Sequence, residues 1–141
     1  MRNLEFFEDL ENMRNCPIEV TLNIIGKKWA INIIRDLFKG KTRFSEFLDS
    51  NPQLSTKMLS LRLKELQKSD IIKKTIKSTT PVIIEYCLTQ QGKNLNKILF
   101  QLAEFSLKNY PNKVYNQISN ATEDDISSLK KFFRADGIHP I

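Results

Sequence analysis

Residues 43–68 read RFSEFLDSNPQLSTKMLSLRLKELQK, which is typical of two short helices around a tight turn. Thr42 is a suitable N-cap for a first helix over residues 43 to about 50, with its aromatic residues facing inward. Asn51-Pro52 is a turn signal. Ser55 can cap a second helix, which we expect to run to about residue 69.

The second helix has two contrasting faces. At about 100° per residue, its leucines at 59, 63 and 66 cluster within about 60° of one another and form a stripe for the core. The opposite face presents cations, a hydroxyl and one leucine: Lys57, Ser60, Leu61, Lys64 and Lys68. An apolar residue on a polar face needs some partner, so Leu61 indicates a contact beyond the chain.

A β-hairpin follows these helices. Residues 71–77 are short and β-branched, residues 78–81 form a turn, and residues 82–88 alternate in polarity. Two helices and then a hairpin are typical of a winged helix-turn-helix. The predicted fold class is therefore mainly α with a β-hairpin (α+β).

The flanking segments predict further helices. We expect helices over residues 3–14, over 17–25 with Pro17 in the first turn, and over 28–39, apolar on most sides and capped by Gly40. A long helix is expected from Thr89 to about 109. A loose stretch should follow it, and then a last helix from Thr122 to about 134. The long helix repeats Leu95, Ile98, Leu102 and Phe105 at spacings of 3, 4 and 3, as at a coiled-coil seam.

Composition limits the classes of protein. The chain has 141 residues, two cysteines, one histidine and a formal net charge of +6. Two cysteines exclude a disulfide scaffold and leave too few thiols for a structural zinc site. No apolar run approaches the ~18–20 residues of a membrane span, and the first residues resemble no targeting peptide. We therefore expect a cytoplasmic protein without a membrane or cofactor role.

The positive charge is concentrated in the middle of the chain. Residues 26–78 hold 13 Lys and Arg against 5 Asp and Glu, a net charge of +8, and the other residues hold 9 against 11. Concentrated positive charge suits a polyanion-binding surface. A solvated lysine-rich face explains the charge alone equally well.

Placing the second helix in a DNA major groove gives a set of candidate contacts. Lysine and serine can contact phosphates or base acceptors, and Leu61 can rest on a thymine methyl group. The amide end of the first helix and the cation of Arg43 could together hold a phosphate. An amphipathic helix with lysines for solubility is the alternative. The candidate DNA contacts are Arg43, Ser55, Thr56, Lys57, Ser60, Leu61, Lys64, Lys74 and Lys77.

Ordered short motifs resemble one known family. They are Cys16-Pro17-Ile18-Glu19, Ile25-Gly26-Lys27-Lys28-Trp29, Gly40, Arg43-Phe44-Ser45-Glu46, Leu54-Ser55, Lys57-Met58-Leu59, Arg62-Leu63-Lys64-Glu65-Leu66, Pro81, Glu85-Tyr86, Leu88-Thr89 and Gly92. With these the chain resembles the HxlR-type winged helix-turn-helix transcription regulators. The resemblance implies a homodimer that binds a pseudo-palindromic DNA operator. It also implies dimer contacts from the N-terminal and long C-terminal helices: Leu4, Phe7, Leu10, Leu95, Ile98, Leu102 and Phe105.

The chain also departs from the family pattern. Relatives tend to be polar where Leu61 stands, which favours a different base preference. They often carry Arg or Lys where this chain has Ile83, so the wing contact falls to Lys77. The chain continues past the typical family end. We therefore divide it into residues 1–110, the winged domain with its dimerisation helices, and a C-terminal extension over residues 111–141.

Cys16 is a candidate redox sensor, since some members of the resembled family sense oxidants or electrophiles through a cysteine at this position. The positive end of a helix dipole favours the thiolate, which is the reactive form of a thiol. A small buried residue between two helices is the alternative role. Cys87 alternates with the inward Tyr86 and is a packing residue in this interpretation.

Other classes of function find less support. No cysteine–histidine or serine–histidine arrangement and no glycine-rich phosphate loop appears in the sequence, so we expect no enzyme activity. A winged helix used for protein or RNA contacts is the alternative function, because a fold does not determine what it binds. The sequence names no small-molecule effector.

Overall fold

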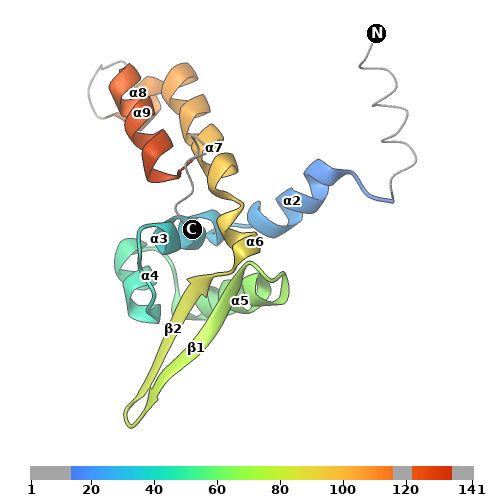
Figure 1. The fold of residues 1–141 in the computed structure, drawn as a ribbon, viewed down its shortest axis with the longest axis vertical. Coiled ribbons are helices and arrows are strands. Elements are labelled where there is room, and N and C mark those ends of the chain that lie inside the picture. The colour runs from blue at the N-terminus through green and yellow to red at the C-terminus, as the bar shows by residue number, and fades with distance from the viewer. Residues whose placement is uncertain (1–13, 116–121, 135–141) are drawn as a thin grey trace. The chain divides into compact units, whose positions relative to one another are not determined.

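The structure, a computed structural model, describes residues 14–115 and 122–134 (Figure 1). The chain divides into two compact units, with the boundary between Cys87 and Leu88. The first unit contains helices α2 (Pro17–Ile25), α3 (Ala30–Phe38), α4 (Phe44–Ser50) and α5 (Thr56–Lys68) and the strands β1 (Ile72–Thr79) and β2 (Val82–Leu88). These elements confirm the predicted helix pair and hairpin.

The core of the first unit lies around α3. Ile33 and Ile34 of α3, Phe47 of α4 and Leu59 of α5 are completely buried. The ring of Phe47 meets the ring of Tyr86 edge-on, with centroids 6.4 Å apart. Each such side chain contributes roughly 1.5–3 kcal/mol by leaving water. The apolar pattern over residues 28–39 therefore correctly predicted the central helix.

The end of α3 confirms the predicted role of Gly40. This glycine has a φ of +88°, a backbone conformation that a side chain disfavours. Its N–H donates to the carbonyl of Leu37 at 3.0 Å, and the N–H of Lys41 donates to the carbonyl of Asp36 at 3.0 Å. These two bonds form a Schellman motif, which satisfies the last carbonyls of the helix and turns the chain toward α4.

The N-terminus of α4 differs from the prediction by one residue. Arg43 is the N-cap, and Thr42 lies outside the helix. The cause is Glu46, whose Oε2 accepts hydrogen bonds from the N–H groups of Thr42 at 2.7 Å and Arg43 at 3.2 Å. The carboxylate at the third helical position thus satisfies the N–H groups of the N-cap residue and of the residue before it.

The hairpin extends beyond the helices of its unit (Figure 1). Strand β1 continues to Thr79, two residues past its expected end, so the turn is narrower than residues 78–81 and includes the cis bond between Thr80 and Pro81. The carbonyl of Thr42 accepts a hydrogen bond from the N–H of Tyr86 at 2.8 Å. This bond ties β2 to the segment before α4.

The second unit contains α6 (Gln90–Lys93), α7 (Asn96–Asn109), α8 (Pro111–Val114) and α9 (Glu123–Phe132). The expected continuous helix from residue 89 to 109 is wrong, because it is interrupted at Asn94 and Leu95. There the N–H of Leu95 donates to the carbonyl three residues back, at Gly92, in place of four. Gly92 precedes this break and Asn94 lies in it, and both residue types are poor helix formers.

Helix α9 packs against α7 within the second unit. It begins as predicted, since Thr122 is the N-cap and its hydroxyl accepts from the N–H of Asp125 at 3.1 Å. The Nδ2 of Asn96 donates to the carbonyls of Phe133 at 2.9 Å and Arg134 at 3.2 Å, so the start of α7 binds the end of α9. The boundary expected after residue 110 does not coincide with the boundary between units. Part of the expected loose stretch is the short helix α8.

Candidate nucleic-acid interface

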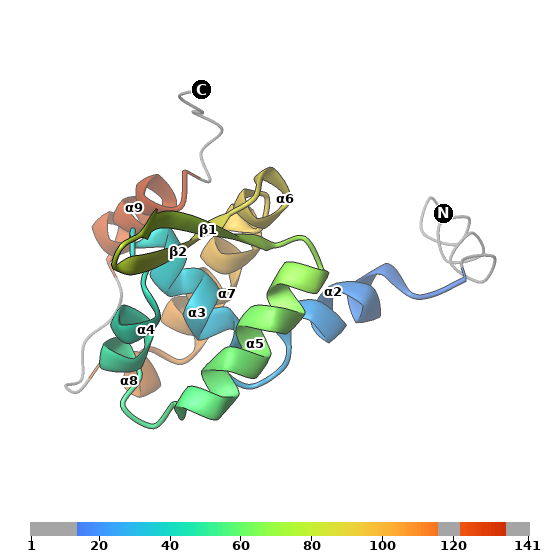
Figure 2. The ribbon, with the colours of Figure 1, turned by 90° about the horizontal axis from the view of Figure 1, so that it is seen from below.

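Helix α5 lies at the outside of the first unit (Figure 2), and its predicted polar face is exposed. Its leucine stripe is buried, with Leu63 and Leu66 each 2% exposed. The opposite side is exposed, and its residues are Lys57, Ser60, Leu61, Lys64 and Lys68. Leu61 is 46% exposed on this face. The helical wheel therefore placed this face correctly.

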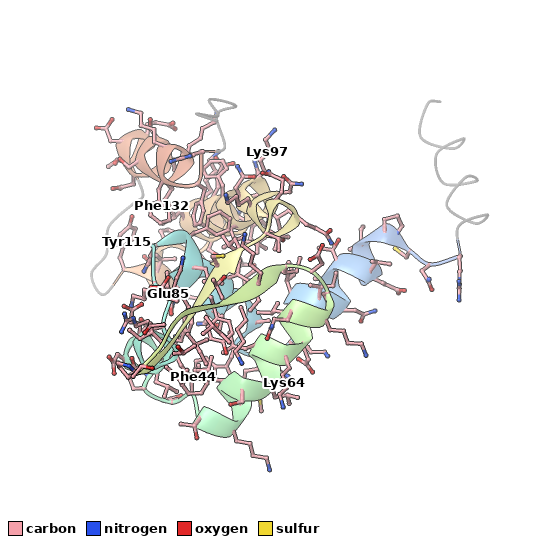
Figure 3. All side chains as sticks on the ribbon, turned by 60° about the horizontal axis from the view of Figure 1, so that its bottom comes forward. Phe44, Lys64, Glu85, Lys97, Tyr115 and Phe132 are labelled. Carbon is pink, nitrogen blue, oxygen red and sulfur yellow. The ribbon has the colours of Figure 1, made fainter. Side chains whose placement is uncertain are left out.

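The cations of this face are available to an external anion. In the described parts of the chain, neither Lys57 nor Lys64 pairs with a carboxylate. Lys64 is labelled on α5 in Figure 3. An ammonium group without an internal partner can neutralise a phosphate without first breaking an ion pair.

The start of α5 supplies two hydroxyl groups. Ser55 is the N-cap, and its Oγ accepts a hydrogen bond from the N–H of Met58 at 3.1 Å. Accepting this bond leaves the hydroxyl hydrogen of Ser55 for donation to an external acceptor. Thr56, the first residue of the helix, is also exposed.

The expected phosphate site at the start of α4 is only partly supported. The Arg43 side chain is exposed, but Glu46 occupies the backbone N–H groups of Thr42 and Arg43. These backbone hydrogen bonds hold the pKa of Glu46 below its ordinary value, so its carboxylate is charged at neutral pH. A second anion would meet this negative charge. Arg43 is therefore an exposed cation close to a charged carboxylate.

The hairpin carries the remaining lysines of the set. Lys74 is exposed. Lys77 is also exposed, and its Nζ lies 3.9 Å from Oε2 of Glu85 on the neighbouring strand. Glu85 is labelled on β2 in Figure 3. An exposed pair at this distance is weak, so Lys77 can exchange the carboxylate for a phosphate at little cost.

Two exposed apolar residues on the hairpin were not predicted. Ile76 is 61% exposed and Val82 is 65% exposed. Ile72 has the same parity as Ile76 along β1 and is 1% exposed. Both isoleucines therefore share a face, but only the one near the helices is covered. Alternation predicts the face of a strand and not where its cover ends, so no sequence signal pointed to this difference.

A second group of contacts fixes α5 to the loop before α3. Nε of Arg62 donates to the carbonyl of Lys28 at 2.8 Å, and Nη1 lies 2.9 Å from Oε2 of Glu65. Nζ of Lys27 lies 3.1 Å from the other oxygen of Glu65. Burial opposes the charge on Glu65, but the bonds from Lys27 and Arg62 outweigh it and lower its pKa. Some cations of the 26–78 segment are thus structural.

The predicted dimer residues have different surroundings. Leu4, Phe7 and Leu10 lie outside the described residues. Leu95 is buried, whereas Ile98, Leu102 and Phe105 are exposed along one side of α7, next to Lys97 and Gln101. Three of the four seam positions therefore offer accessible apolar surface.

Cys16 is exposed at the N-cap of α2, and its thiol is free. The alternative role, a small residue between two helices, involves the helix expected before Cys16, and residues 1–13 of that segment lie outside the described residues. Cys87 is half-buried and also free. Among the described residues, no three His, Cys, Asp or Glu side chains gather at a metal-binding distance. No helix in those ranges is long and apolar enough to cross a bilayer.

A family model described as HxlR-like helix-turn-helix matches residues 24–114. The chain belongs to the HxlR-like helix-turn-helix family. This match includes α5, the hairpin and α7, and it ends before α9. The chain is a winged-helix, DNA-binding transcriptional regulator of the HxlR type, and the comparisons do not favour a protein- or RNA-binding module.

Individual relatives agree with this assignment. The chain is 34% identical over 110 residues to YdeP of Bacillus subtilis, an HTH-type transcriptional regulator, covering 77% of this chain and 86% of the relative. The reduced form of the regulator YodB from B. subtilis superposes with a TM-score of 0.62 at 32% identity, covering 70% and 96% of the two chains. The redox regulator HypR in its oxidized form superposes with a TM-score of 0.61 at 37% sequence identity. This match covers 67% of this chain and 97% of the HypR chain. These relatives are regulators and not enzymes.

Proposed function

We propose that the chain binds a pseudo-palindromic operator as a homodimer in the cytoplasm, with α5 of each copy in the major groove. The observation that carries this proposal is the exposed face of α5, where exposed lysines flank a serine and a leucine opposite a buried leucine stripe. A two-fold symmetric dimer presents two such helices and so fits two half-sites of inverted sequence.

Within the interface, phosphates and bases are contacted by different residues. Lys57 and Lys64 bind phosphates, and the hydroxyls at the start of α5 add neutral hydrogen bonds. Ser60 and Leu61 are central on the face and reach base edges, with Leu61 against a thymine methyl group. Arg43, Lys74 and Lys77 contact the flanking backbone. Phosphate contacts thus give affinity, and two residues choose the sequence.

The second copy is held by the exposed side of α7. Ile98, Leu102 and Phe105 recur at spacings of 4 and 3, which suits helix-to-helix packing across a two-fold axis. In the single chain Leu102 is 52% exposed and Phe105 is 59% exposed. Burying these side chains against a second copy supplies the apolar area that a stable dimer needs.

Cys16 makes operator binding responsive to oxidants in this proposal. Its thiol is exposed and lies at the N-terminal end of a nine-residue helix. YodB is represented by both a reduced and a diamide-treated structure, and HypR is named a redox regulator. Operator affinity should change on treatment with diamide, and a Cys16→Ser variant should not respond. If diamide changed the operator affinity of this variant as it does that of the unaltered protein, Cys16 would not be the sensor.

The experiment for operator binding recovers genomic DNA fragments with the purified full-length chain and sequences them. We expect a common inverted repeat and a footprint of two half-sites about one helical turn apart. Random recovery, with equal affinity for every duplex, would contradict sequence-specific binding.

A further inference from the structure

Asp36 in α3 and Asn51 at the end of α4 form a buried polar pair in the first unit. Asp36 is 0% exposed and Asn51 is 4% exposed. Nδ2 of Asn51 donates to Oδ2 of Asp36 at 2.9 Å. Nε and Nη2 of Arg35 donate to the other carboxylate oxygen at 3.2 and 3.0 Å. Both oxygens of the buried carboxylate therefore have partners, as a buried charge requires.

Asn51 connects this carboxylate to the turn before α5. Its Nδ2 also donates to the carbonyl of Phe47 at 2.8 Å, and its Oδ1 accepts from Nη2 of Arg35 at 3.3 Å. Its backbone carbonyl accepts from the N–H of Leu54 at 2.8 Å. Leu54 directly precedes Ser55, the N-cap of α5. Asn51 thus joins α3 to the end of α4 through its side chain and holds the turn into α5 through its backbone carbonyl.

A buried charged pair is by itself weak evidence for a stabilising role. Well-packed apolar residues often replace a buried charged group without loss of stability. Apolar contacts have no preferred direction, whereas hydrogen bonds fix both distance and angle. The hydrogen bonds of the pair are therefore better suited to fixing the orientation of the turn than to stabilising the fold.

We propose that Asp36 and Asn51 are positioning residues for sequence-specific DNA binding, which hold α5 at the angle where its exposed face meets base edges. This inference rests on the proposed operator binding. Base contacts require accurate placement of α5, while contacts to the regular phosphate backbone tolerate a small tilt. Loss of the pair thus lowers affinity for the operator and spares affinity for random DNA.

For an Asp36→Asn variant, the inference and simple electrostatics predict opposite changes in operator affinity. The substitution keeps the shape of the side chain and removes one negative charge from a DNA-binding unit. Electrostatics alone would raise affinity for every duplex. A fall in operator affinity must therefore come from the altered orientation of α5 and not from charge.

The test measures the affinities of unaltered protein, Asp36→Asn and Asn51→Ser for the recovered operator and for a random-sequence duplex at one salt concentration. Asp49→Asn is the matched control, because it removes the same charge at an exposed position of α4, two residues before Asn51. The measurements are made at a temperature at which circular dichroism melting curves show each protein to be folded. The ratio of the two affinities is the readout.

We expect the ratio to fall on the order of tenfold in Asp36→Asn and Asn51→Ser, similar to the removal of one base contact. Affinity for random duplex should stay equal or rise, and the control should keep the unaltered ratio. An unchanged ratio in the folded variants would overturn the assignment. Failure of both variants to fold at any temperature would also overturn it, because the pair would then have only a structural role. Equal affinity of the unaltered protein for all duplexes is a separate result, which removes operator binding itself.

Discussion

At the scale of single residues, the proposed base contacts of α5 depend most on Leu61. Exposed lysines at 57, 64 and 68 lie on its side of the helical wheel, and its nearest apolar neighbour there is the half-buried Met58. An exposed leucine gains from contact with a thymine methyl group, but it gives nothing to a solvated surface. Its exposure was predictable from the helical periodicity of the sequence alone, because α5 is one uninterrupted helix of 13 residues.

Replacing Leu61 by serine tests this role. We expect the preferred base at one position of each half-site to change from thymine, with a decrease of about 1–3 kcal/mol in binding free energy for the original operator. Selection of duplexes from a random pool, followed by sequencing, measures the preference. Ser128→Ala on α9 is the control for a general effect of substitution. The same selected motif for Leu61→Ser and unaltered protein would contradict the contact.

Glu46 gives a residue-scale prediction about pH. Hydrogen bonds from the N–H groups of Thr42 and Arg43 lower its pKa from the ordinary value of 4.5. Its stabilising effect is therefore fully present above pH 4.5 and is lost as the pH falls through the lower folded-state pKa. Urea unfolding between about pH 3 and 7 should show a weaker pH dependence for Glu46→Gln. Equal pH dependence would show that the cap is not formed in solution.

At the scale of elements, local sequence signals predicted most of the helices and strands, but they did not predict contacts between residues distant in the sequence. The leucine stripe predicted α5, and alternating polarity predicted β2. Glu46 three residues after Arg43 was a signal for the true start of α4, but Thr42 is the commoner cap type. The break before α7 had its signal in Gly92 and Asn94. The pairing of Asp36 with Asn51 had none, because 15 residues separate them and sequence period does not report such contacts.

Helix α7 gives the prediction at element scale. A Leu102→Asp variant places a charge in the exposed apolar side of the helix, where a second copy would desolvate it. We expect a monomer in analytical ultracentrifugation and a large decrease in operator affinity. Ser127→Asp adds the same charge on the exposed part of α9 and should remain dimeric. A dimeric Leu102→Asp protein would place the interface elsewhere.

At the scale of the whole molecule, the net charge of +6 separates into parts with different roles. Lys27 and Arg62 hold Glu65, and Arg35 holds Asp36. Other cations of the 26–78 segment, including Lys57 and Lys64, are exposed on the predicted DNA side. The distribution of charge suits a polyanionic partner, but only the structure separates the cations that hold the fold from those that can meet phosphates.

The salt dependence of operator binding tests the central claim, that the exposed face of α5 binds DNA. The logarithm of affinity should fall linearly and steeply with the logarithm of salt concentration for the unaltered protein. In Lys57→Ala and Lys64→Ala the slope should be shallower by about one for each phosphate that each copy no longer neutralises. Lys131→Ala, on the exposed end of α9, is the control and should keep the original slope. Unchanged affinity and slope in both α5 variants would contradict the account.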